Sequence, residues 1–188
     1  MNIVVGILGV ALVATLTDYT WYTLNVRHTV IAGVIDGVVM LTAVGAVLGL
    51  DAGRVWKGLP IGALAGAAGA FVYYLLIAIM GRRGYFSAIP AAWVTLWLIL
   101  AVLDGRWLRA PAIRSWAAIA VRGVLAAVVS GVAFYFVMNT LWGRSPAGKN
   151  YFVQFAAWAI AWAPGLMALT IRRQSAISIH ESEMSRSR

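Results

Sequence analysis

The chain has 188 residues, of which 62% are apolar and 11% are charged, against roughly 25% charged in an ordinary soluble domain. So few charges do not cover the surface of a soluble fold of this size, which excludes a soluble enzyme and a free nucleic-acid-binding domain. The net charge is +9. The basic residues lie between apolar runs, where they set membrane topology and contact lipid headgroups, and no nucleic acid partner is expected.

Six segments in chain order are long and apolar enough to cross a bilayer core, which takes about 20 residues of helix. They are Ile3–Leu24, Val30–Leu50, Leu59–Met80, Tyr85–Leu103, Ala117–Leu141 and Tyr151–Ile171. The breaks between them are short and contain charged residues or turn formers. The sequence therefore predicts an all-α integral membrane protein, with a six-helix transmembrane domain over residues 1–173. The polar, serine-rich segment 174–188 is expected to be a disordered cytoplasmic tail.

The basic residues are distributed unevenly between the two sides of the predicted bundle. Nine lie in the second and fourth loops and the C-terminal tail, and five lie in the first, third and fifth loops. Basic residues favour the cytoplasm, so a multi-pass protein of the inner (cell) membrane with both termini cytoplasmic is expected. Arg122, near the cytoplasmic end of the fifth span, is expected to extend toward the lipid headgroups.

No catalytic or cofactor motif is present. The chain has no cysteine and two histidines, His28 and His180, which excludes thiolate metal sites and histidine-rich metal centres. We expect no cofactor, no metal site and no catalytic residue. Enzyme activity is therefore not the leading hypothesis, although two carboxylates that share a proton leave a membrane-embedded aspartyl chemistry open.

Asp18 and Asp36 lie inside apolar spans, where an ionised carboxylate costs several kcal/mol and usually faces a cavity or a partner. Both are about six residues from the predicted outer ends of adjacent helices, so we expect them to share one site, roughly 10 Å into the bilayer. The alternative is that each hydrogen-bonds to backbone or pairs with Arg27.

Aromatic residues gather at the same depth. Asp18, Trp21 and Tyr22 have i, i+3, i+4 spacing and share one helix face. The sequence predicts a cavity that opens outward and binds a cationic or flat aromatic solute through ring faces and carboxylate. Its predicted residues are Asp18, Trp21, Tyr22, Asp36, Tyr74, Trp93, Trp97, Tyr135, Trp158 and Trp162. Two alternatives stay open: tryptophans such as Trp21 form interfacial belts, and Trp97 and Trp162 pack between helices.

An internal repeat is indicated by two similar hairpins. The fourth span contains Ala91-Ala92-Trp93 followed by Trp97, and the sixth contains Ala156-Ala157-Trp158 followed by Trp162. The preceding helices also align, with Gly62 and Tyr74 opposite Gly123 and Tyr135. The pattern suggests three parallel two-helix repeats, of which the first aligns more loosely.

Small residues recur every four positions at Gly33 and Gly37, and again at Gly62, Gly66 and Ala70. Such stripes let helix backbones approach closely. Packing within the chain is the leading interpretation, and docking of a partner subunit or of a second copy is the alternative.

The size and the six-helix plan of the whole chain resemble the substrate-binding subunits of energy-coupling-factor vitamin transporters. The resemblance implies a small solute bound near the outer face and a partner docked on small-residue stripes, and it transfers no residue roles. Two functions follow as expectations: a transporter or transporter subunit that binds a solute, or a non-catalytic structural subunit of a larger membrane complex.

Overall fold

The computed structural model describes residues 2–24, 30–81, 85–109, 115–142 and 150–170. The predicted disordered tail, both histidines and Arg27 lie outside the described residues. The proposed pairing of an aspartate with Arg27 is therefore a prediction on which the structure gives no information.

Six long helices account for nearly all of the described chain, and all six are long and apolar enough to cross a membrane. They are α1 (Ile3–Thr23), α2 (Val30–Asp51), α3 (Val55–Met80), α4 (Tyr85–Leu103), α5 (Trp116–Val137) and α6 (Tyr151–Thr170). Two π-helical turns, η2 (Asp104–Leu108) and η3 (Met138–Trp142), continue α4 and α5. The all-helical architecture predicted from hydropathy is thus confirmed, whereas the repeat relationship stays a prediction.

The start of α3 and the end of α4 differ most from the predicted helix ends. Helix α3 begins four residues before the predicted Leu59, so it takes in Lys57 and keeps Pro60 inside the helix. The break predicted at Asp104–Arg106 is wrong, because the chain stays helical through η2 as far as Leu108. Hydropathy marks a charged residue as a boundary, but here the charge at Asp104 is buried among partners from other helices.

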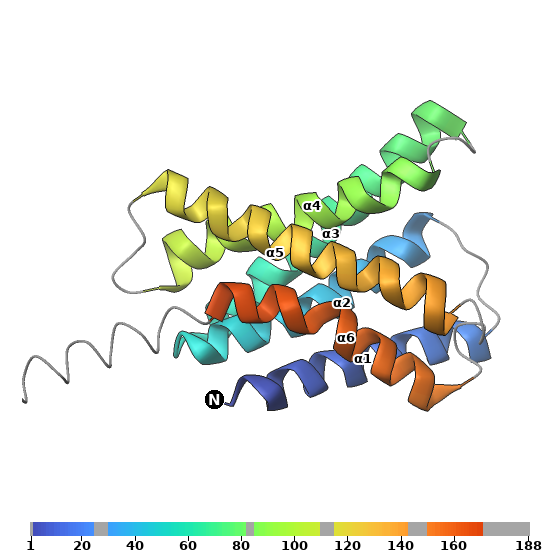
Figure 1. Ribbon diagram of the computed structural model, residues 1–188, viewed down its shortest axis with the longest axis horizontal. Coiled ribbons are helices and arrows are strands. Elements are labelled where there is room, and N and C mark those ends of the chain that lie inside the picture. The colour runs from blue at the N-terminus through green and yellow to red at the C-terminus, as the bar shows by residue number, and fades with distance from the viewer. Residues whose placement is uncertain (1, 25–29, 82–84, 110–114, 143–149, 171–188) are drawn as a thin grey trace, which may run out of the picture.

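The helices form an up-and-down ring (Figure 1). Each helix packs against the next one in chain order, and α6 returns to pack against α1. As a result the start of α3, the turn η2, the start of α5 and the end of α6 lie at one end of the molecule. We call this the basic end, because Arg54, Lys57, Arg106, Arg109 and Arg122 are all found there. The other end holds the end of α1 and the start of α2.

Helices α2 and α3 approach to backbone contact. A Cβ atom built on Gly45 would lie 2.6 Å from the Gly62 nitrogen, and one built on Gly66 would lie 2.6 Å from the Gly37 carbonyl carbon. Neither position has room for a side chain. The packing role predicted for these stripes is therefore confirmed at Gly37, Gly62 and Gly66, which contact the neighbouring helix of the same chain.

Aromatic rings fill the core between α4, α5 and α6. The indole of Trp93 stacks on Phe134 and on Trp162, with centroids 4.7 and 4.9 Å apart. Trp97 and Trp162 are 0% and 1% exposed. A Cβ atom on Gly165 would overlap the Trp97 indole, so the glycine makes room for this ring inside the bundle.

Candidate solute-binding site

Asp18 on α1 is held by two side chains of α6. Its carboxylate accepts a 2.7 Å hydrogen bond from the indole nitrogen of Trp158, and it also accepts a hydrogen bond from the side-chain amide of Gln154. Gln154 and Trp158 are one helical turn apart, so both donors reach the same carboxylate. The bonds offset part of the cost of placing a carboxylate within an apolar helix.

Asp36 on α2 is held in a similar way, by an indole of α1. The indole nitrogen of Trp21 donates a 3.0 Å hydrogen bond to the Asp36 carboxylate. Because Asp18 and Trp21 are three residues apart on α1, a single stretch of this helix contacts both α6 and α2 through polar bonds. The charges of Asp18 and Asp36 are close enough to interact. The observed partners of these aspartates are thus indoles and an amide.

A cavity of about 280 Å³ lies beside Asp36, between α2, α3 and α4. Asp36, Tyr73 and Tyr74 are its polar lining residues. The other lining residues are small or aliphatic: Gly33, Gly37, Leu41, Gly66, Gly69, Ala70, Ala92 and Leu96. Asp36 and both tyrosines are half-buried. The lining glycines allow close packing around the cavity: a Cβ atom on Gly66 would overlap the backbone of Gly37, and one on Gly33 would overlap the Tyr74 hydroxyl.

The structure brings some predicted site residues together and separates others. Asp36 and Tyr74 line one cavity. Trp21 is not among its lining residues, but its indole donates a hydrogen bond to the Asp36 carboxylate in the cavity wall. Asp18 and Trp158 contact each other on the α1–α6 side. Asp18 and Asp36 thus accept hydrogen bonds from different helices, α6 and α1, and a common cavity for the two aspartates stays a prediction.

The remaining predicted residues do not line the cavity beside Asp36. Trp97 and Trp162 are enclosed in the aromatic core, as in the packing alternative. Trp93 and Tyr135 border a separate space of about 50 Å³, which is too small for a typical ligand. Tyr22 is 50% exposed near the end of α1. For all of these residues a contact with solute stays a prediction.

Gln154 was missed by the sequence analysis. A signal was present, since Gln154 is an amide in the sixth apolar span and lies four residues before Trp158. Hydropathy scores such a residue as a minor interruption, because it does not reveal that a carboxylate on the first helix faces it.

A second polar cluster lies at the basic end. The buried carboxylate of Asp104 forms salt bridges with Arg109 (2.8 Å) and Arg122 (3.3 Å), and Arg109 also lies 3.6 Å from Asp51. Both arginines donate to the Leu169 carbonyl of α6, Arg109 at 2.7 Å. The expectation that Arg122 extends to the lipid headgroups is wrong, because its side chain is only 6% exposed. This cluster joins α2, η2, α5 and α6, and its charges balance, which indicates a structural role.

Comparisons with known proteins do not assign the chain to a family. No family model matches it, and no match was found among curated proteins or solved structures. The function proposed for the chain therefore depends on the geometry of the two carboxylates and the cavity.

Proposed function

We propose that the protein binds a small cationic or aromatic solute in the cavity beside Asp36, and that it acts as a transporter or as the solute-binding subunit of a transport system. The observation that supports this proposal is a carboxylate in the wall of a 280 Å³ cavity that two tyrosines also line. A carboxylate neutralises a cation, and aromatic faces attract it. The volume is at the lower end of the usual range for ligand pockets, which favours a small solute.

Trp21 gives Asp36 a fixed orientation. Its indole hydrogen bond occupies one carboxylate oxygen, Oδ1, and leaves the other oxygen available to a ligand. Asp18 contributes negative charge from outside the cavity wall. A cationic solute therefore contacts the Asp36 carboxylate directly and is attracted electrostatically by the Asp18 carboxylate. Both interactions offset the free energy needed to remove the cation from water.

The structural-subunit hypothesis was based partly on small-residue stripes free to dock a partner. Gly37 and Gly66 contact each other within the chain, so they give this hypothesis no support. The remaining support for the structural-subunit hypothesis is the apolar outer surface. A lipid bilayer would cover that surface as well as a partner subunit would, so it does not favour the hypothesis.

A screen of amines and vitamin-like cations by intrinsic tryptophan fluorescence tests the proposal. Asp36→Asn should weaken binding about tenfold or more, since hydrogen bonds to charged groups contribute about 1.5–3 kcal/mol. Asp18→Asn should weaken it less, because Asp18 does not line the cavity. Trp21→Phe should remove much of the fluorescence response while equilibrium dialysis still detects binding.

Asp51→Asn is the matched control, because it removes a carboxylate at the basic end and should leave affinity unchanged. The proposal fails if no compound shifts the signal, or if Asp51→Asn lowers affinity as much as Asp36→Asn. Co-purification with a larger complex at fixed stoichiometry, without any solute response, would favour the structural-subunit hypothesis.

A further inference from the structure

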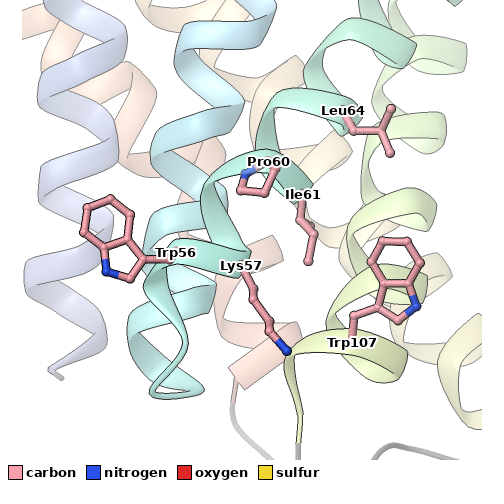
Figure 2. Close-up of a pocket in the computed structure, with 6 residues that line it drawn as sticks. All are labelled: Trp56, Lys57, Pro60, Ile61, Leu64 and Trp107. Carbon is pink, nitrogen blue, oxygen red and sulfur yellow. The ribbon is translucent and has the colours of Figure 1, made fainter.

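A groove at the basic end (Figure 2) shares no lining residue with the cavity beside Asp36. It has a volume of about 380 Å³. Its lining residues are Trp56, Lys57, Pro60, Ile61, Leu64 and Trp107. One of the six is charged, and none is acidic. The groove lies on the outer surface of the first turns of α3, where α3 faces η2.

The groove has a polar end and an apolar end. In Figure 2 the ammonium group of Lys57 lies at one end of the group of residues and Leu64 at the other. Lys57 and Leu64 are seven residues apart on α3, which corresponds to about 10 Å along the helix. Ile61 lies between them and is 4% exposed, whereas Leu64 is 54% exposed. The ammonium group forms no salt bridge with any described residue.

Two exposed indoles border the groove. Trp56 is 83% and Trp107 61% exposed, and both belong to segments long and apolar enough to cross a membrane. Indoles favour the boundary between headgroups and acyl chains. Their position places Lys57 at the level of the lipid phosphates, and Leu64 one or two turns deeper among the chains.

The two walls of the groove are tied together. The guanidinium of Arg54, which precedes α3, donates a 3.3 Å hydrogen bond to the backbone carbonyl of Trp107 in η2. On the adjacent surface the guanidinium of Arg106 lies 4.8 Å from the centre of the Trp116 ring. Arg54, three residues before Lys57, therefore adds positive charge near it, and its hydrogen bond links the start of α3 to the end of η2.

We infer that this groove is a binding site for an anionic phospholipid. The lipid phosphate pairs with Lys57, and one acyl chain lies along Pro60, Ile61 and Leu64. Charge complementarity favours an anionic over a zwitterionic lipid, because the ammonium or choline of a zwitterionic headgroup is repelled by Lys57 and Arg54. Such basic sites at the level of the headgroups recognise anionic lipids. The inference is independent of the proposed solute binding.

Lipids with brominated acyl chains test the inference, because bromine quenches the fluorescence of a tryptophan that it contacts. The full chain is reconstituted in phosphatidylcholine with a minor fraction of either brominated phosphatidylglycerol or brominated phosphatidylcholine. Wild type should be quenched more by the anionic lipid. Lys57→Gln should lower the apparent affinity for it about fivefold, and Lys57→Arg should retain it.

The double variant Trp56→Phe/Trp107→Phe should lose the excess quenching, because both reporters at the groove are gone. Trp116→Phe is the matched control, since it removes an exposed indole at the same end but outside the groove, and it should keep the excess. Equal quenching by the two lipids would overturn the inference. So would an unchanged excess in Lys57→Gln, or an equal loss in Trp116→Phe, which would indicate a general attraction of anionic lipid to the basic end.

Discussion

Three of the four described carboxylates, those of Asp18, Asp36 and Asp104, accept hydrogen bonds from side chains outside their own helix. Asp18 accepts from α6, Asp36 from α1, and Asp104 from Arg109 and Arg122. An unpaired carboxylate in this setting costs several kcal/mol. The three differ in their surroundings: Asp104 is fully enclosed by arginines, whereas Asp36 borders a cavity. That difference is the reason for assigning a structural role to Asp104 and a binding role to Asp36.

Asp104→Asn should destabilise the protein by about 3–5 kcal/mol, because it leaves the buried Arg122 and the half-buried Arg109 without their shared carboxylate. Unfolding in a denaturing detergent, followed by far-UV circular dichroism, measures the change. Asp51→Asn is the control, since the Asp51 side chain is 18% exposed and its contact with Arg109 is 3.6 Å. A change of about 1 kcal/mol or less is expected there. Equal effects of the two substitutions would contradict the assigned difference.

At this scale the sequence identified Asp18 and Asp36 as unusual but did not identify their donors. It placed Asp104 in a loop and Arg122 at the headgroups, and both expectations were wrong. The physical reason is that pairing between helices depends on which faces meet. In a hydropathy profile a charged residue near the end of an apolar run indicates the end of a helix. Asp104 and Arg122 instead pair inside the bundle, although they are 18 positions apart in the sequence.

Among the elements, α2 and α3 depend on glycine most directly. Gly45, Gly58 and Gly62 lie so close to the facing backbone that no side chain fits. Close approach of this kind increases van der Waals contact, which drives helix association in lipid, where the hydrophobic effect between helices is absent. The same α2–α3 pair forms two walls of the cavity beside Asp36.

Gly45→Ala should destabilise the protein by about 1–3 kcal/mol, because the added methyl group forces α2 and α3 apart. Gly9→Ala is a matched control on α1, where a Cβ atom would meet nothing within 4 Å. That substitution should be neutral or stabilising by up to about 1 kcal/mol, through helix propensity. The same detergent unfolding measurement compares both. A stable Gly45→Ala variant would show that α2 and α3 can separate without cost.

At the scale of the whole molecule, the two ends of the ring differ in chemistry. The basic end has the ion-pair cluster and the groove at Lys57, and the other end has Asp18 and Asp36 with their indole donors and the two cavity tyrosines. The distribution of basic residues, nine against five in the loops and tail, predicts that the basic end faces the cytoplasm. The cavity beside Asp36 would then open toward the outside.

Reporter fusions test this orientation. Green fluorescent protein fused after Arg188 should fluoresce, and alkaline phosphatase at the same position should be inactive, because both report a cytoplasmic C-terminus. Phosphatase inserted at residues 82–84, in the third loop, should be active. The opposite pattern would reverse the orientation and would place the groove at Lys57 in the outer leaflet.

The sequence by itself determined the number, length and order of the helices, because crossing a bilayer requires about 20 apolar residues and every such run is local in the chain. It also selected Asp18, Asp36 and the glycine stripes, since each is unusual within its own helix. Only the tertiary structure decided that Trp97 and Trp162 pack in the core, that Trp21 and Gln154 are hydrogen-bond donors, and that Asp36 borders a cavity while Asp104 is sealed. These outcomes depend on how each helix is rotated about its own axis, and that rotation is fixed by contacts between residues far apart in sequence.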